Sequence, residues 1–485
     1  MSFPARLVLA CLLAGGLLPL GAVSTASADP AGPHGRRAVA TPYSTLAMRD
    51  LFVARPRLDP LEKIVARVLL ARPTDGANDP GGDGYRGASE KVCGRRICVH
   101  YAVRGADAPP SRRWALRTLR VLGSVWDHEV DGLRFRPPPA DGKRGGDSRF
   151  DVYLAELGSR GLFGYCTPER RVRGERLAAS SYCVLDDDFA KRQFGEPAIN
   201  SLRVTAAHEF FHAVQFGYDF REDPWLLEST ATWMEETFAD RVDDNRRYLP
   251  YGTVHHPGVP LDDFSNDRYA QYGTWAWWQY LTDRYGQGLV RAVWRAADSV
   301  GRGTNLYSVE ALAAVLSRHG GLGRALTSYA VANLSPADSY AEGRSWPSAE
   351  VGHPSPIGPD QPKATRRVRI DHLAARHVAF RPGSHLSGRW WRLRVHVEAP
   401  RRRSAARVVV RRADGSAVAH VLRLDRAGDG DLAVRFDPAR VHRVVVTLVN
   451  TSTRYDCHED SLFACGGKPL DDGARYAVRA ELFRR

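Results

Sequence analysis

The chain has 485 residues, enough for two or three domains with buried cores, and its 43% hydrophobic and 26% charged residues are ordinary for a globular protein. The formal net charge is +14, with Arg residues spread along the whole chain and no dense Lys/Arg block at either end. Together with the lack of a helix-turn-helix, RNA-recognition or zinc-finger pattern, this excludes a specific nucleic-acid reader, although the charge fits non-specific attraction to anionic polymers.

The first 28 residues are typical of a secretory signal peptide. Arg6 precedes the apolar stretch "LVLACLLAGGLLPLGAV", and the small residues "ASA" at positions 26–28 form a cleavage site. The short apolar core and its Gly and Pro residues argue against a membrane anchor. We therefore expect a secreted, extracellular protein whose mature chain starts at Asp29 and has no transmembrane span.

Six cysteines would remain after removal of this signal. An even number in an exported protein is typical of disulfides, and no CxxC pair indicates a metal site. The six fall into three couples that are close in sequence, so we expect the bonds Cys93–Cys98, Cys166–Cys183 and Cys457–Cys465.

Residues 29–90 form an N-terminal segment with one strong helix signal. Asp59 can cap a helix that begins at Pro60. The apolar stripe of this helix consists of Leu61, Ile64, Val65, Val68 and Leu69. Two interpretations stay open: an inhibitory pro-segment, or an ordinary helix docked on the core.

The rest of the chain predicts an α+β fold. In residues 91–335, β-type runs at 97–103, 149–157 and 180–189 accompany an amphipathic helix at 111–131, and residues from 198 onward are mostly helical. Residues 336–365 are rich in Pro, Ser and Gly and predict a linker. Residues 366–485 contain short β-type runs separated by turn residues, which predicts a small β-sandwich.

The stretch "VTAAHEFFHAVQFGYD" at positions 204–219 is typical of a catalytic metal site. In a helix, His208 and His212 lie one turn apart on the same face, so both can bind one zinc ion. Glu209 lies one step round the helix, where its carboxylate can take a proton from a water on the metal. The alternative is a core helix, but an ionised Glu209 in an apolar run is costly without a partner.

A catalytic zinc also needs a third protein ligand. Asp223 and Pro224 predict the start of a second helix, which a hairpin would bring back beside the first. Glu228 lies in the first two turns of that helix and is the expected ligand. Glu235, seven residues later on the same face, is the alternative.

"AHEFFHAVQFGYD" followed by "WLLESTATWMEE" resembles the secreted bacterial zinc metalloproteases of the gluzincin type, in the zincin (peptidase MA-like) clan. The resemblance extends over about 91–335 and implies a zincin-like domain with a mixed sheet, an HExxH helix and a helical subdomain. It implies His208, His212 and Glu228 as metal ligands and Glu209 as the catalytic residue. The chain departs from the family pattern at Ser229, where Gly is usual, and at Thr232, where thermolysin-like enzymes carry an Asp that orients a histidine.

These residues predict a zinc endopeptidase that acts on protein or peptide substrates. Zinc would polarise the scissile carbonyl, and Glu209 would act as general base. The candidates for an oxyanion donor are His255, His256, Tyr269 and Tyr272, of which we favour Tyr272. The alternative function is a non-catalytic binding or adhesion module that keeps the metallopeptidase fold.

Two further features receive structural interpretations. The tryptophans at 275, 277 and 278 are expected to pack the helical region. The acidic clusters at 186–188 and 456–472 are expected to form solvated turns, with a structural Ca²⁺ ion as the alternative at both places.

Overall fold

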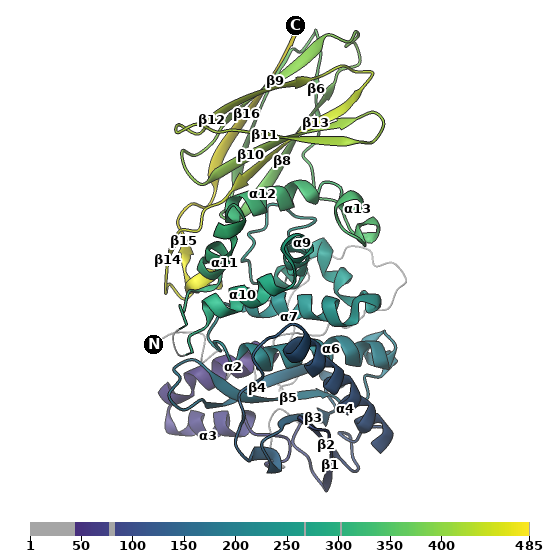
Figure 1. The fold of residues 1–485 in the computed structure, drawn as a ribbon, viewed down its shortest axis with the longest axis vertical. Coiled ribbons are helices and arrows are strands. Elements are labelled where there is room, and N and C mark those ends of the chain that lie inside the picture. The colour runs from purple at the N-terminus through teal and green to yellow at the C-terminus, as the bar shows by residue number, and fades with distance from the viewer. Residues whose placement is uncertain (1–43, 77–82, 266–267, 301–302, 485) are drawn as a thin grey trace, which may run out of the picture. The chain divides into compact units, whose positions relative to one another are not determined.

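The computed structural model describes residues 44–76, 83–265, 268–300 and 303–484, and the predicted signal peptide at 1–28 lies outside them. The described chain is a mixture of helices and several sheets, as expected for an α+β fold (Figure 1). Its contacts divide it into two compact units. The first unit comprises residues up to 221 together with 234–243 and 298–303, and the second comprises 222–233, 244–297 and 304 onward.

The first unit contains a five-stranded sheet. Its strands are β1 (Ser89–Cys93), β2 (Ile97–Ala102), β3 (Phe150–Ala155), β4 (Gly164–Arg171) and β5 (Ala179–Asp186), in the order β1-β2-β3-β5-β4. β2, β3 and β5 are parallel, whereas β1 and β4 pair antiparallel at the two edges. Every residue of β2, β3 and β5 is buried, which is typical of parallel strands covered on both faces. The three predicted β-type runs are therefore confirmed.

Four main helices accompany this sheet: α2 (Ser44–Ala54), α3 (Pro60–Leu69), α4 (Arg112–Trp126) and α6 (Ala198–Gln215). α3 begins as predicted, with Asp59 as N-cap and Glu62 completing a capping box. Its apolar stripe differs from the prediction, because Leu61 is 71% exposed and Ile64 57% exposed. Only the end of the stripe, at Leu69, is buried.

α6 carries the HExxH sequence and is the most deeply buried of these helices. Its residues from Val204 to Gln215 are all buried, and it packs on β4, β5 and α4. A helix that is surrounded on all sides cannot show a one-sided apolar stripe. Its polar residues therefore have to be explained by specific partners inside the protein.

The second unit contains the helices α8 (Ala270–Gly273), α9 (Trp275–Tyr285), α10 (Gly288–Ala297), α11 (Ser308–Leu316), α12 (Leu322–Ala332) and α13 (Pro336–Ser339), besides shorter turns. Trp275, Trp277 and Trp278 are fully buried, so the predicted packing role is confirmed. Trp278 stacks on Trp225, with ring centroids 6.1 Å apart. α12 packs on strands of the C-terminal part, so residues before 335 share a compact unit with residues after 365.

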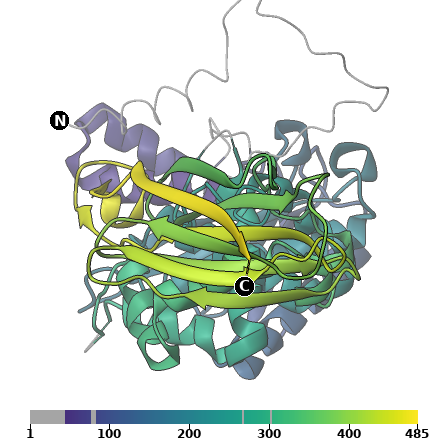
Figure 2. The ribbon, with the colours of Figure 1, turned by 90° about the horizontal axis from the view of Figure 1, so that it is seen from above.

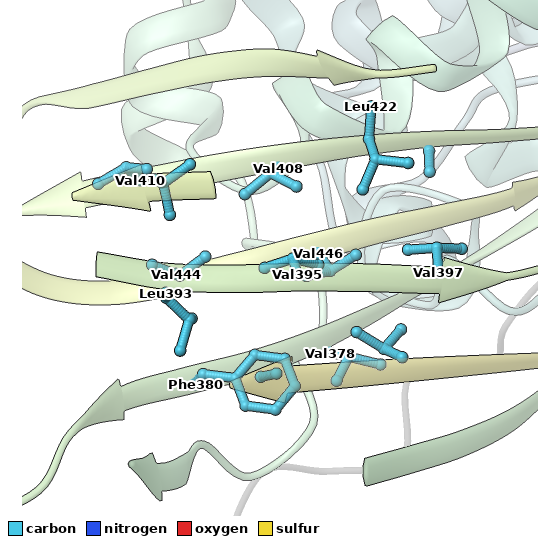
Figure 3. Packing of buried hydrophobic residues seen from close by; sticks show 14 of the residues in the cluster. Val378, Phe380, Leu393, Val395, Val397, Val408, Val410, Leu422, Val444 and Val446 are labelled. Carbon is cyan, nitrogen blue, oxygen red and sulfur yellow. The ribbon is translucent and has the colours of Figure 1, made fainter. Parts of the chain in front are cut away.

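The C-terminal strands form two larger sheets around one core. Their bounds are β6 (Ser355–Ile357), β7 (Lys363–Ile370), β8 (Ala374–Pro382), β9 (Trp391–Glu398), β10 (Ser404–Arg412), β11 (Ala417–Leu422), β12 (Asp429–Arg435), β13 (Val441–Asn450) and β16 (Ala474–Arg484). The sheet orders are β11-β10-β13-β8-β6 and β12-β9-β16-β7. Figure 2 shows these green and yellow strands from above. Figure 3 shows buried side chains of this core from both sheets; Val395 and Val397 of one sheet and Val444 and Val446 of the other belong to the same cluster and are fully buried.

A buried histidine links loops within the second unit. His372 donates through both ring nitrogens, from Nδ1 to Asp472 Oδ1 at 2.6 Å and from Nε2 to Asp262 Oδ1 at 2.8 Å. Burial alone would lower the pKa of His372, but the two carboxylates outweigh it and raise this pKa to about 9. The imidazolium therefore holds the two aspartates together at neutral pH.

The three predicted disulfides, Cys93–Cys98, Cys166–Cys183 and Cys457–Cys465, are all formed. Cys93–Cys98 joins β1 to β2, and Cys166–Cys183 joins the edge strand β4 to β5. Among the described residues, every helix is too short or too polar to cross a bilayer.

Candidate metal centre

The helical spacing of α6 brings the two motif histidines together. The ring centroids of His208 and His212 are 4.8 Å apart, with the ring planes at 78°. His208 is 8% exposed and His212 only 1%, so both imidazoles lie inside the first unit. Two adjacent buried imidazoles are a donor pair that suits zinc.

Both histidines are oriented through the same ring nitrogen. His208 Nδ1 lies 2.6 Å from Glu235 Oε1, and His212 Nδ1 lies 2.7 Å from Gln215 Oε1. A carboxylate oxygen can only accept, so Nδ1 of His208 carries a proton, and in the neutral ring Nε2 carries the lone pair that can bind a metal. Such a carboxylate behind a histidine is the usual support of a zinc ligand. Glu235, predicted as an alternative third ligand, thus contacts a histidine in the structure.

Glu209 lies next to the edge strand β4. A Cβ atom added to Gly164, the first residue of β4, would be 3.0 Å from Glu209 Cγ, so the strand passes directly against this side chain. Thr45 Oγ1 of α2 donates a hydrogen bond of 2.9 Å to Glu209 Oε2. The same hydroxyl accepts a 2.9 Å hydrogen bond from the backbone N–H of Cys166 on β4. The spacing of the motif gave no sign of Thr45 or Gly164.

Glu129 is a further buried carboxyl that the sequence did not reveal. It follows α4 in a π-helical turn (Asp127–Gly132), is fully buried, and its two oxygens have no hydrogen-bond partner among the described residues. Burial raises the pKa of Glu129 well above its ordinary range, while the charge of His208 opposes this shift. In sequence it ends an amphipathic helix pattern, where a charged side chain is normally exposed.

Glu228 lies on α7 (Pro224–Ala239), the helix predicted after the motif, and is fully buried. α7 belongs to the second unit up to Trp233 and to the first unit from Met234. Thr232 donates from Oγ1 to the carbonyl of Glu228, at 3.0 Å, so it does not replace the orienting Asp of thermolysin-like enzymes. Ser229, at the usual Gly position, accepts a 2.9 Å hydrogen bond from Trp278 Nε1.

The candidate oxyanion donors all lie in the second unit. Tyr272, on α8, is buried, and its ring centroid is 5.0 Å from that of Tyr248. His255 and His256 have partners of their own: Nδ1 of His255 lies 2.8 Å from the carbonyl of Ser348, and Nδ1 of His256 lies 3.1 Å from a Glu350 oxygen. A role for Tyr272 stays a prediction.

Several groups of His, Asp and Glu side chains among the described residues could bind a metal ion, and His208, His212 and Glu228 form one of them. The donor set of two imidazoles and a carboxylate fits zinc, although such donors do not define the metal. No protein-family model matches the chain, and a comparison with curated proteins also gives no match.

Proposed function

We propose that the protein is a secreted zinc-dependent endopeptidase, with Glu209 as its general base. The observation that carries the proposal is the pair His208 and His212, whose Nδ1 atoms are both held by oxygen acceptors. With Nδ1 of each ring engaged by an oxygen, Nε2 is the nitrogen through which each histidine would bind a metal. This arrangement also explains why buried polar residues occupy the middle of an apolar helix.

Glu228 is the proposed third ligand. Glu228 and Glu235 are seven residues apart on one continuous helix, so they share a face two turns apart. Glu235 contacts Nδ1 of His208. Glu228 therefore lies on the face of α7 that includes the partner of a motif histidine. The grouping of His208, His212 and Glu228 as possible ligands supports this assignment.

When bound, zinc would polarise a peptide carbonyl and lower the pKa of a water molecule. Glu209 would accept the proton of that water at a carboxylate oxygen and pass it to the leaving amine. Glu209 is 7% exposed and lies against strand β4, so its side chain is largely shielded from bulk water. Tyr272 is the proposed donor to the oxyanion.

The finer architecture belongs to the same proposal. The parallel strands with antiparallel edges and the buried helix α6 support a zincin-like domain within 91–335. The two C-terminal sheets with their common core support a β-sandwich within 366–485. The three disulfides support export to an oxidising, extracellular location after removal of residues 1–28.

The direct test is casein hydrolysis by the chain from Asp29, beside its Glu209→Gln variant at matched zinc content. We expect cleavage only with the parent, because glutamine cannot accept the proton. If both forms hold zinc and neither they nor a zinc-loaded chain that begins after α2 cleaves casein or a mixed peptide library, the alternative of a non-catalytic binding module replaces the proposal. Mass spectrometry of the metal in the parent protein checks that zinc is the ion bound.

A further inference from the structure

Three carboxylates, those of Glu156, Asp186 and Asp187, meet at one end of the sheet of the first unit. None of them belongs to the HExxH motif. β3 and β5 are neighbouring parallel strands, with Ala155 opposite Asp186, so the residues that follow them lie side by side. Ligand oxygens of Glu156, Asp186 and Asp187 all lie within 4.8 Å of one another. Asp186 is fully buried and Asp187 is 4% exposed, so the predicted solvated turn is wrong.

Asp186 has a clear structural role. Its Oδ2 accepts hydrogen bonds from the backbone N–H groups of Leu157 and Gly158, at 3.1 and 2.7 Å. Its Oδ1 accepts from the N–H groups of Asp188 and Phe189, at 3.2 and 2.6 Å. These bonds fix the two loops that leave β3 and β5, and they account for the charge of Asp186.

In the described part of the chain, comparable hydrogen bonds are not seen for Asp187. Its Oδ1 is buried and has no hydrogen-bond partner among the described residues, and no Lys or Arg in this part of the chain forms an ion pair with Glu156, Asp186 or Asp187. Burial raises the pKa of Asp187 to about 8, with a further contribution from the neighbouring carboxylates. A buried carboxylate without a partner is costly, and a bound cation removes that cost.

We propose that Glu156, Asp186 and Asp187 bind a divalent cation of the calcium class. All the donors are carboxylate oxygens, which favour hard cations over zinc. Ca²⁺ fits better than Mg²⁺, because Mg²⁺ demands near-octahedral geometry whereas Ca²⁺ accepts irregular sets. The ion would join the ends of β3 and β5 and stabilise the connection that leads to α6. This site is independent of the proposed peptidase activity.

The test uses the Glu209→Gln chain from Asp29, in which self-cleavage cannot disturb the measurement. Calcium binding is measured by isothermal titration calorimetry and by the unfolding midpoint, with zinc present throughout. We expect calcium at 100 times its Kd to raise the midpoint by about 3 °C or more, and magnesium to do less. Asp187→Asn should abolish the shift, whereas Asp338→Asn, an exposed carboxylate in the second unit, should keep it.

Two results would overturn the proposal. Equal calcium shifts in the parent and Asp187→Asn would place the ion elsewhere. The second result is that the Glu209→Gln chain binds no calcium and that adding Asp187→Asn raises its unfolding midpoint without calcium. This result would identify Asp187 as a buried neutral acid.

A second inference comes from α2, which packs on β4 (Figure 1). The hydroxyl of Thr45 donates to Glu209 and accepts from the N–H of Cys166. One side chain of α2 therefore contacts both the proposed general base and the outer edge of β4. α2 is held there by buried apolar side chains, including Leu51 and Phe52, and Phe52 packs edge-on against Phe220 at 5.4 Å.

The segment that follows α2 is anchored differently. Arg72, beyond α3, forms buried ion pairs with Asp141, with Asp151 at 2.7 Å and with Glu169 at 2.7 Å. Removing this arginine would leave three buried carboxylates without it, which is strongly destabilising. A cut between α2 and α3 would therefore remove α2 and leave Arg72 in place as the partner of these carboxylates.

We infer that α2 is an inhibitory segment that must leave β4 before substrate reaches Glu209. This inference rests on the proposed peptidase function. Because a peptide that pairs with the edge of β4 would use backbone N–H groups such as that of Cys166, Thr45 and an extended substrate compete for β4. The division of the N-terminal segment falls between α2 and α3, near Leu58, rather than at residue 90.

The test compares three chains on a fluorogenic peptide library: one that begins at Ser44, one that begins at Asp59, and the Ser44 chain with Thr45→Ala. We expect at least a tenfold higher kcat/KM for the Asp59 chain and an intermediate value for Thr45→Ala. Equal rates in all three would reject inhibition while leaving the peptidase function intact. If none of the three chains cleaves, the proposed peptidase function is rejected. The binding affinity of a peptide hydroxamate then tests the inhibitory contact by itself: equal affinity for the Ser44 and Asp59 chains rejects that contact.

Discussion

Replacing Glu235 tests whether the histidine pair is built for a metal. The carboxylate of Glu235 lies 2.6 Å from His208 Nδ1, and the two side chains are only 9% and 11% exposed. Partners of this kind fix the ring and raise its basicity, and their loss typically weakens metal binding about 10–100-fold. This range corresponds to about 1.4–2.7 kcal/mol.

We therefore expect Glu235→Ala to weaken zinc binding by about 10–100-fold. Glu235→Gln keeps an acceptor oxygen at the same place and should lie at the lower end of that range. Glu236→Gln is the matched control, because Glu236 is the next residue of α7, is also buried, and points about 100° further round the helix. Glu228→Gln should weaken binding more than either change at 235, since it alters a proposed ligand.

The assay is competition for zinc between the apoprotein and a fluorescent chelator of known affinity, at constant pH. Circular dichroism of each apoprotein shows that the variants are folded before zinc is added. The reasoning is refuted if Glu235→Ala binds zinc as tightly as the parent, or if Glu236→Gln weakens zinc binding as much as Glu235→Ala. A loss at Glu235→Gln as large as that at Glu228→Gln would instead make Glu235 a metal ligand.

Three other changes have measurable outcomes. Gly164→Ala should lower kcat with zinc content unchanged, because the new Cβ would lie 3.0 Å from Glu209 Cγ, as from Leu185 and Thr205, and would press on that side chain. Replacing the Cys166–Cys183 disulfide with two alanines should cost about 3 kcal/mol in the free energy of unfolding, measured with denaturant, since it opens a loop of 17 residues. Because the folded pKa of His372 is raised to about 9, its stabilisation is complete below its ordinary pKa near 6.5 and is lost as pH rises through 9. The midpoint of thermal unfolding should fall over that range in the parent and not in His372→Gln; an unchanged slope would contradict the assignment.

The sequence alone determined the features that depend on local spacing. Two histidines four residues apart share a helix face, and Asp59 and Pro60 define a helix start, because both follow from backbone geometry within one turn. The disulfide couples followed from an even number of cysteines and short separations. The α+β class followed from runs of β-branched residues beside helical patterns.

Only the tertiary structure decided which distant side chains meet. Glu235, Thr45 and Gly164 contact the motif residues from separate parts of the chain, and no periodicity relates them to α6. Burial was equally hidden. Asp187 lies in an acidic stretch that is typical of an exposed turn, yet it follows a strand in the middle of the sheet and is buried. Local spacing fixes what one helix presents to its surroundings, whereas the packing of the whole chain fixes which groups it meets there.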